Sequence, residues 1–304
     1  MPKLDGQVIL ILSSIRCMRI AFLSIADLRG YVTDDDLVFE PLRALGHVAE
    51  FVPWQQTAVR WCEYDAVVIR STWDYQNKLV AFLSALQQIE AQTRLANLLG
   101  VVRWNADKIY LRDLAEKGAN IAPTLWHKGK IERRQIEEWF QQLQTDEIVI
   151  KPTVSASAQD TVRLKRGAAD ITRLSQLFNH RSCMVQPFMR GIAEEGEFSL
   201  CYFNGAYSHA ILKTPKAADF RVQEEHGGTI RAIEPPRNLA AAGERISQYI
   251  PAPLLYARVD FVRTEGDEFA LMELELIEPS MYLRTAEHSP RLFAAAINQW
   301  LLQV

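Results

Sequence analysis

The chain has 304 residues, of which 48% are hydrophobic and 23% charged, as in a globular protein of about two domains or of one multi-lobed domain. The formal net charge of −3 argues against nucleic acid as the main partner, because phosphate binding needs a basic surface. The four cysteines are widely spaced without a CxxC pair, so we expect neither a disulfide framework nor a zinc site, and a reducing cytoplasm is the simplest location. The apolar run 8–12 is too short to cross a membrane.

The first third of the chain alternates between strand and helix patterns. Strands are expected at 18–24, 48–52 and 66–69, and helices at 37–45 and 78–91. The run 66–69 is apolar throughout, which is typical of a strand buried on both faces. This alternation predicts a parallel sheet in a small α/β domain. Residues 1–17 precede the first strand and are expected to be disordered or loosely docked.

After Asn105 the pattern changes. Helices are expected at 109–117, 132–143 and 171–178, and strands at 148–150, 184–188, 198–203, 207–213, 257–261 and 271–279. Asn204-Gly205, between two of these strands, is a strong signal for a two-residue β-hairpin. The second half is therefore expected to be α+β, with antiparallel strands.

The last two predicted strands carry three carboxylates, Asp260, Glu273 and Glu275. If these strands pair as a hairpin, the acids lie on neighbouring strands, with Glu273 and Glu275 on one face because they are two residues apart. Such acids repel one another unless a cation lies between them, and Mg²⁺ takes one or two carboxylates together with water and phosphate oxygens. The alternative is a solvent-facing acidic stripe on an edge strand.

Two lysines occur in positions suited to phosphate binding. Lys151 ends an apolar strand and precedes the small-residue loop 153–158, whose backbone N–H groups can approach a phosphate. Lys108 begins a helix, with Asn105 or Asp107 as its N-cap. Taken singly, each also fits a solvated surface lysine.

The segment Gln186-Pro187-Phe188-Met189 would place an aromatic side chain and exposed backbone between two lobes, where backbone groups can bind an adenine edge. Glu197, at the start of the next strand, is suited to accept hydrogen bonds from ribose hydroxyls. The alternative is an ordinary connector between domains.

These features follow one another in a fixed order along the chain. They are Lys108, Lys151 with the small-residue loop 153–158, the segment 186–189 that we call the hinge, Glu-Phe-Ser at 197–199, Lys213, Arg-x-Asp at 258–260 and Glu-x-Glu at 273–275. This ordered set, over residues 19–304, resembles the ATP-grasp superfamily. The resemblance implies an α/β and α+β fold in which an N-terminal parallel-sheet domain is followed by two α+β lobes that clasp the nucleotide. It implies domains at 18–104, 105–185 and 186–304, after the extension 1–17.

The resemblance also implies the residues of the site. Nucleotide would be bound by Lys108, Lys151, Ser155, Ser157, Gln186, Pro187, Phe188, Met189, Glu197 and Lys213. Magnesium would be bound by Asp260, Glu273 and Glu275. Arg258 would stabilise the transferring phosphoryl group, and Lys213 would reach the phosphate or an acyl phosphate.

Two departures from the family pattern concern this site. Family members often have glycines after the second lysine, whereas residues 155–158 are Ser-Ala-Ser-Ala, so backbone conformations with φ > 0 become costly. Glu275 stands where Asn is frequent in the family, which adds a negative charge and leaves the ligand set of the metal open.

Within the superfamily the chain most resembles bacterial glutathione-synthetase-like ligases, and the segments 71–75 and 273–280 are similar to those of the cyclo-ligases of D-cycloserine biosynthesis. The resemblance implies a cytoplasmic, ADP-forming ligase that uses ATP and Mg²⁺ to activate a carboxylate or carbonyl-type oxygen and couples it to an amine, between two molecules or by ring closure. It implies an amino-acid-like small-molecule substrate, a homodimer or tetramer, and no nucleic-acid or membrane partner.

Two other functions remain to be weighed. One is a nucleotide-binding regulatory module without catalysis, against which the three acids and Arg258 argue. The other is a dinucleotide-binding dehydrogenase, but the first strand is not followed by the GxGxxG motif that such a site requires.

The segment 70–75 follows the buried strand 66–69, at the sheet edge where open parallel sheets bind ligands. Arg70 would hold a substrate carboxylate and Asp74 an amine, Thr72 would also contact the substrate, and Trp73 and Tyr75 would form a wall of the pocket. The alternative is a structural loop that caps the next helix.

A second substrate-contacting segment is expected after Lys213. Arg221, Gly227 and Gly228 lie in a polar stretch that is expected to form a mobile loop over the site, with the two glycines supplying flexibility.

Overall fold

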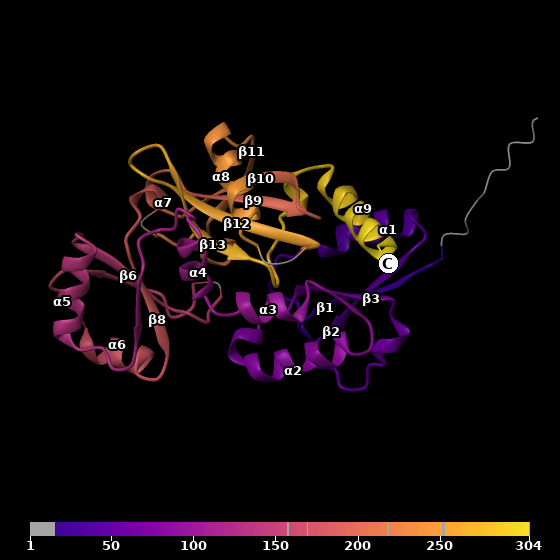
Figure 1. The fold of residues 1–304 in the computed structure, drawn as a ribbon, viewed down its shortest axis with the longest axis horizontal. Coiled ribbons are helices and arrows are strands. Elements are labelled where there is room, and N and C mark those ends of the chain that lie inside the picture. The colour runs from indigo at the N-terminus through magenta and orange to yellow at the C-terminus, as the bar shows by residue number, and fades with distance from the viewer. Residues whose placement is uncertain (1–15, 157, 169, 218, 251–252, 304) are drawn as a thin grey trace, which may run out of the picture.

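The structure, a computed structural model, describes residues 16–156, 158–168, 170–217, 219–250 and 253–303. Its strands form three sheets, which belong to the three lobes seen in Figure 1. The sheets follow one another along the chain, so each lobe is largely built from one continuous part of the sequence.

The N-terminal lobe contains a parallel sheet with strand order β2-β1-β3-β4. Its elements are β1 (Arg19–Ser24), α1 (Phe39–Ala44), β2 (Val48–Pro53), β3 (Ala66–Ser71), α2 (Leu79–Glu90), β4 (Arg94–Ala96) and α3 (Leu99–Asn105). Along β1, Ile20 and Phe22 join one hydrophobic cluster, whereas Ala21 and Leu23 join another that includes Phe82 of α2. Both faces of the sheet are therefore buried, as parallel sheets require.

The middle lobe contains an antiparallel sheet with strand order β5-β8-β6-β7. Its elements are β5 (Leu125–Lys128), α5 (Arg133–Gln142), β6 (Glu147–Pro152), β7 (Val162–Lys165), α6 (Ile171–Phe178) and β8 (Ser182–Pro187). Ile136, Trp139 and Phe140 recur at helical spacing on α5 and share one cluster with Ile148 and Ile150 of β6. The helix α4 (Tyr110–Glu116) precedes this lobe.

The third lobe contains a five-stranded antiparallel sheet with order β11-β10-β9-β12-β13. Its elements are α7 (Arg190–Glu194), β9 (Glu197–Phe203), β10 (Ala206–Thr214), β11 (Thr229–Ile233), α8 (Arg237–Ser247), β12 (Tyr256–Arg263) and β13 (Phe269–Glu275). Asn204 and Gly205, with φ of 48° and 75°, form the predicted two-residue turn between β9 and β10.

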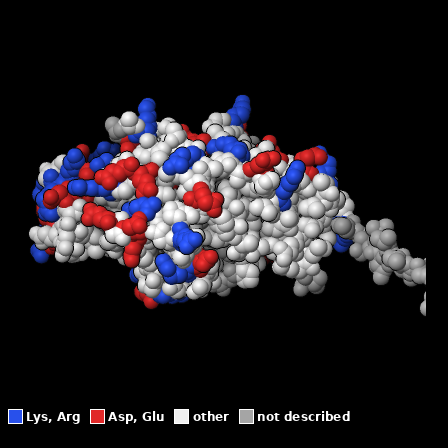
Figure 2. All heavy atoms as spheres, turned by 90° about the horizontal axis from the view of Figure 1, so that it is seen from above, with Lys and Arg blue, Asp and Glu red and all other residues white. Residues whose placement is uncertain are grey.

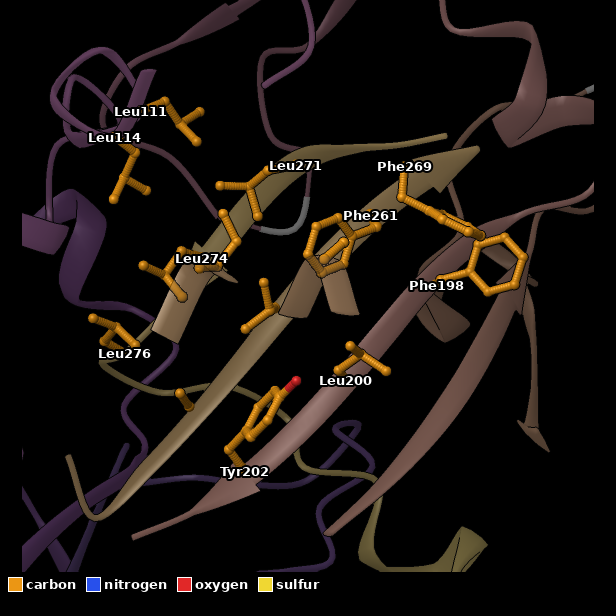
Figure 3. Close-up of a cluster of buried hydrophobic side chains, with 14 of the residues drawn as sticks. Leu111, Leu114, Phe198, Leu200, Tyr202, Phe261, Phe269, Leu271, Leu274 and Leu276 are labelled. Atoms are coloured by element: carbon orange, nitrogen blue, oxygen red, sulfur yellow. The ribbon is translucent and has the colours of Figure 1, made fainter. Parts of the chain in front are cut away.

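The two faces of this sheet differ, because successive side chains of a strand point to opposite sides. Leu200, Phe261 and Leu274, from three neighbouring strands, belong to one apolar cluster with Leu111 and Leu114 of α4 (Figure 3). The opposite face carries polar side chains such as Ser199 and Asp260, and also Phe203 and Tyr256, which belong to a second apolar cluster.

The last helix, α9 (Ser289–Leu302), returns to the N-terminal lobe and lies beside α1 (Figure 1). Phe293 of α9 stacks on Phe203 of β9, with ring centroids 4.6 Å apart, and shares a cluster with Phe22 of β1. The helix therefore ties the N-terminal sheet to the third sheet, and residues far apart in sequence meet between them.

The surface carries charges of both signs. Figure 2 shows Lys and Arg side chains interspersed with Asp and Glu over part of the face that it presents. No helix in the described part of the chain is long and apolar enough to cross a bilayer.

The predicted fold class is confirmed, with a parallel sheet in the N-terminal region and antiparallel sheets elsewhere. The sequence analysis missed the short helices α3 and α7, the helices α8 and α9, and the short strands β4, β5, β7 and β11. The expected boundary between residues 185 and 186 falls inside β8. Residues 1–15 of the expected extension lie outside the described residues.

Candidate active site

The polar face of the third sheet carries the acids predicted to bind metal. Arg258 and Asp260 on β12 lie opposite Glu275 and Glu273 on β13 in the antiparallel register. Residues two apart on a strand share a face, so the hairpin gathers these four side chains on the side opposite the apolar cluster.

Asp260 is the centre of a buried ionic network. Lys213 on β10 contacts Glu197 on β9, and its Nζ lies 3.0 Å from Oδ2 of Asp260. Arg258 donates to Asp260 from Nε and Nη2 at 3.0 and 2.9 Å, and Ser199 donates its hydroxyl at 2.6 Å. Although burial opposes ionisation, the charges of Arg258 and Lys213 hold the pKa of Asp260 below its usual value. Asp260 is thus a fixed anion that orients two cations.

The two lysines predicted to bind phosphate differ in their partners. Lys108 Nζ lies 2.7 Å from Oε1 of Glu273 and donates to the carbonyl of Ser155 at 2.8 Å. The side chain of Lys151 has no ion-pair or hydrogen-bond partner among the described residues, and burial lowers its pKa. A half-buried ammonium group without a partner favours an anionic ligand.

The three predicted metal ligands do not converge on one point. Within the described residues no group of three metal-binding side chains is arranged to hold an ion, because Glu273 is drawn to Lys108 and Glu275 to Arg258. The donors nevertheless fit Mg²⁺ in kind: Glu273 and Glu275 line the cavity with 29% and 27% of their side chains exposed, and both present carboxylate oxygens. Asp260 would have to release Arg258 or Lys213 to join them.

The state of Glu275 is consistent with a cation at this point. Burial, and then the charge of Glu273, raise the pKa of Glu275 to about 7, although Arg258 opposes the shift. A bound divalent cation would offset that repulsion and favour the ionised form.

The loop after Lys151 reaches left-handed backbone conformations without glycine. Ala158 and Asp160 have φ of 54° and 57°, which costs roughly 1–2 kcal/mol for each L-residue. Arg181 pairs with Asp160, which helps to hold the loop. Ser155 lines the cavity, and Ser157 lies outside the described residues.

The hinge is built around the aromatic side chain of Phe188. Its backbone N–H donates to the carbonyl of Glu147 at 2.8 Å, so this group is already used inside the protein. The guanidinium of Arg163 lies 3.5 Å from the centroid of the Phe188 ring, and the ring of Phe220 meets Phe188 edge-on at 6.3 Å. Apolar and π surfaces therefore dominate this part of the site.

One cavity, lined by residues of all three lobes, connects these features. Its hinge side is formed by Val149, Lys151, Ser155, Gln186, Pro187, Phe188, Met189, Ile192 and Met272. Its N-terminal side is formed by Tyr31, Val32, Trp73, Tyr75, Glu278, Ser280 and Tyr282. Glu197, Lys213, Arg258, Asp260, Glu273 and Glu275 also line it.

Arg70 does not take the position predicted for it. Its side chain is 1% exposed and is absent from the cavity lining; Nε lies 2.9 Å from Oδ1 of Asp35, and Nη2 donates to the carbonyl of Pro279 at 2.6 Å. Its guanidinium carbon lies 4.9 Å from the centroid of the Tyr256 ring. Arg70 is therefore held inside the interface between the N-terminal and third lobes and lies outside the cavity lining, although its Nη1 has no hydrogen-bond partner among the described residues.

Asp74 and Thr72 are corrected in the same way. Asp74 accepts from Trp54 at 2.7 Å and pairs with Lys78, and Thr72 is fully buried. Both lie outside the cavity lining, whereas Tyr75 lines it. The side chains of Arg70 and Asp74 are therefore bound within the protein, as the structural alternative expects. The expected helix cap is not formed, because the N-cap of α2 has no side-chain hydrogen bond and Oγ1 of Thr72 has no partner among the described residues.

The segment after β10 contributes to the cavity through residues 220–225. Arg221 lines it and forms a paired contact with Asp219, with Nη2 2.8 Å from Oδ2. Gly227, with φ 83°, and Gly228 lie beyond the lining residues. A Cβ on Gly228 would meet the carbonyl oxygen of Val222 at 2.2 Å, so this glycine permits a close turn in the described conformation.

The residues after β13 form an irregular segment, 276–281, that we call the strap. Every carbonyl in the strap accepts a hydrogen bond from a side chain. The donors, from Leu276 to Met281 in order, are Asn97, Tyr256, Trp73, Arg70, Arg258 and His209. The backbone of the strap is therefore fixed from both the N-terminal sheet and the third sheet.

Sequence reasoning missed several lining residues. Tyr31 and Val32 follow the first strand without any motif, and Tyr282 gives no signal before its position in the fold is known. Glu278 belongs to the acidic segment 273–280, but nothing in the sequence shows that it lies on another side of the cavity than Glu273 and Glu275. Only the lobes' arrangement brings these residues together.

The two α+β lobes meeting at a cavity with lysines, a hinge and an acidic hairpin define an ATP-grasp protein. The family model of the prokaryotic glutathione synthetase ATP-grasp domain matches residues 108–268, and that of the N-terminal domain of D-cycloserine synthetase DcsG matches residues 20–97. The chain belongs to the ATP-grasp family and is an ATP-dependent carbon–nitrogen ligase.

Individual relatives support this assignment. The chain is 31% identical over 281 residues to the cycloserine biosynthesis protein DcsG of Streptomyces lavendulae, covering 87% of this chain and 92% of that protein. It is similar to the crystal structure of D-cycloserine synthetase DcsG, with a TM-score of 0.81, 28% identity, and coverage of 93% and 99% of the two chains. The ATP-grasp ligase PsnB, complexed with minimal precursor, Mg and ADP, shares the fold at a TM-score of 0.62 and 16% identity, covering 92% and 97%.

Proposed function

We propose that this protein uses ATP and Mg²⁺ to activate the carboxylate of an amino-acid-like small molecule, and that an amine-type nitrogen of the same molecule then closes a ring. The observation that supports this most directly is the single cavity that joins the unpaired Lys151, the Asp260 network and the hinge. The ring-closing form rests on the similarity to D-cycloserine synthetase.

The nucleotide would lie along the hinge side of the cavity. Its base would contact the ring of Phe188 and the backbone of the hinge, and Glu197 would accept from the ribose. Lys151 and Lys108 would bind the phosphates, with Lys151 available because it has no partner among the described side chains.

Glu273 and Glu275 would hold Mg²⁺, which when bound neutralises the phosphate oxygens and fixes their orientation. Lys108 would then shift from Glu273 toward the phosphate, because Lys108 and Mg²⁺ would compete for the Glu273 carboxylate. The acids thus act by positioning charge and take no proton in the reaction.

In the proposed reaction, a carboxylate oxygen of the substrate attacks the γ-phosphorus and the bond to the oxygen of ADP breaks, giving an acyl phosphate. The nitrogen then attacks the carbonyl carbon, loses a proton, and phosphate leaves as the C–N bond forms. Arg258 and Lys213 stabilise the negative charge that develops, and Asp260 keeps both in place.

A covalent enzyme intermediate is not needed in this scheme. Burial raises the pKa of the Cys183 and Cys201 thiols to about 12, so neither is a ready nucleophile. Catalysis therefore rests on alignment of the two substrates and on charge neutralisation.

The test is a panel of amino-acid-like acids, each scored for ADP and phosphate release in the presence of Mg²⁺. We expect at least one acid to stimulate release, and we expect Asp260→Asn and Glu273→Gln to abolish it while the circular dichroism spectrum is unchanged. ATP binding without turnover for every acid would favour a regulatory module. Undiminished ADP release in either variant would refute the assignment of the acids.

A further inference from the structure

Most charged side chains that line the cavity are already paired. The lysines and arginines other than Lys151 each contact a carboxylate, and Glu224 contacts Arg284. Among the described lining residues, the charged side chains without a partner are Lys151, Glu225 and Glu278. Lys151 is accounted for by phosphate, and Glu225 is exposed to water. Glu278 is half-buried and has no partner for its charge among the described residues, so it is the acid left to bind a ligand.

The backbone around Glu278 is fixed by side-chain hydrogen bonds to three consecutive carbonyl groups. Its carbonyl accepts from Nε1 of Trp73 at 3.0 Å, and the flanking carbonyls of Ile277 and Pro279 accept from Tyr256 at 2.8 Å and Arg70 at 2.6 Å. A carboxylate on such a fixed segment is pre-organised, because little freedom remains to be lost when a ligand binds.

The surroundings of Glu278 on the N-terminal side of the cavity are aromatic. Trp73, which binds the Glu278 carbonyl, also packs against Tyr31 with ring centroids 5.3 Å apart, and Tyr75 completes this wall. Burial, and then the charge of Glu275, raise the pKa of Glu278 to about 8. The ionised form of Glu278 is therefore disfavoured in the empty cavity, and an ammonium group bound beside it would favour that form.

We propose that Glu278, with the aromatic wall of Tyr31, Trp73 and Tyr75, binds a non-reacting ammonium group of the substrate and selects substrates that carry one. Aromatic faces attract organic ammonium ions, and a carboxylate supplies the matching charge-assisted hydrogen bond. Mg²⁺ instead takes an all-oxygen shell of carboxylates, water and phosphate, and the β13 acids Glu273 and Glu275 can supply the carboxylates. This inference rests on the proposed function only for placing the substrate at this side of the cavity.

The inference is tested by ligand binding without turnover, so that its failure is separate from failure of the proposed reaction. The probes are serine, tested in both enantiomers, and 3-hydroxypropionate, which lacks only the ammonium group. Affinities are measured by calorimetry with Mg²⁺ and a non-hydrolysable ATP analogue present. The variants are Glu278→Gln, Glu278→Asp and, as a matched control, Glu287→Gln at an exposed position outside the lining.

We expect the wild-type protein and the control to bind one serine enantiomer about 10- to 100-fold more tightly than 3-hydroxypropionate, as for a hydrogen bond between charged groups. Glu278→Gln should abolish that preference without changing the affinity for 3-hydroxypropionate or the Mg²⁺ requirement for nucleotide binding. Glu278→Asp should retain part of it.

Three results would overturn the inference. The wild-type protein could bind neither serine enantiomer better than 3-hydroxypropionate. Glu278→Gln could weaken both probes equally, which would mark a structural role. Glu278→Gln could also change only the Mg²⁺ requirement for nucleotide binding, which would make Glu278 a metal ligand. Absence of ADP release with an intact serine preference would count against the proposed reaction and leave the subsite standing.

Discussion

Replacing Arg70 with alanine separates a structural role from a substrate-binding one. The Arg70 and Asp35 side chains are 1% and 6% exposed and lie 2.9 Å apart, and Arg70 also binds the strap carbonyl of Pro279. Truncation leaves Asp35 buried without its cation, because Ser71 and Thr33 are its other partners. Breaking a buried ion pair in this way costs about 3–5 kcal/mol, a large share of the roughly 5–15 kcal/mol that stabilises a typical protein.

The assay is urea denaturation of wild type, Arg70→Ala, Asp35→Ala and the double variant, with Arg60→Ala as control. Arg60 forms an exposed pair with Glu63, so its loss should change stability by about 0.5 kcal/mol or less. The double variant should lose less than the sum of the single ones, since the two partners act together. A loss below about 1 kcal/mol for Arg70→Ala, with a selective rise in substrate KM, would refute the structural role and restore the substrate carboxylate to Arg70.

The remaining predictions concern the cavity. Burial and Glu275 raise the pKa of Glu278 to about 8 from an ordinary value of 4.5, so the folded state keeps a proton that the unfolded chain has lost, and stability falls as pH rises through that window. Glu278→Gln should therefore match wild type near pH 4 and be the more stable protein at pH 8 in thermal unfolding; an advantage that does not grow with pH would contradict this. Lys151→Met should raise the KM for ATP about 10- to 100-fold, whereas Lys165→Met, at an exposed position on β7, should leave it unchanged; equal effects would remove Lys151 from the phosphate site. Chelation of divalent metal should abolish ADP release, and Glu275→Gln should raise the Mg²⁺ concentration needed for half-maximal activity; an unaltered Mg²⁺ dependence would show that Glu275 does not hold the ion.

Local patterns were sufficient for the parts of the fold that depend on neighbouring residues. Alternation along 257–261 and 271–277 placed Asp260 and Glu273 on facing strands, and the structure has them in register. The Asn204-Gly205 turn follows from the same kind of signal, because both residues tolerate positive φ.

Positions set by long-range packing were not accessible to the same reasoning. Arg70 lies next to the end of a strand, at the edge where open parallel sheets bind ligands, and nothing nearby in sequence reveals that Asp35 and Pro279 will bind it. Glu278 is the converse case: it resembles its acidic neighbours in sequence, yet the strap carries it to the aromatic side of the cavity. In both cases the outcome depends on how the N-terminal lobe docks on the third sheet.

The glycine-free loop after Lys151 shows a limit of propensity arguments. Left-handed conformations were expected to be costly there, and Ala158 adopts one all the same. Tertiary contacts, among them Arg181 with Asp160, hold the loop against that cost.

The central claim is that phosphate passes from ATP to a carboxylate of the substrate before the C–N bond forms. It is tested most directly with a substrate whose carboxylate is labelled with ¹⁸O, taken from the acids that stimulate ADP release, by following inorganic phosphate with ³¹P NMR. The account predicts that each phosphate released carries one labelled oxygen from the carboxylate. Unlabelled phosphate, with ADP formed at the same rate, would contradict it.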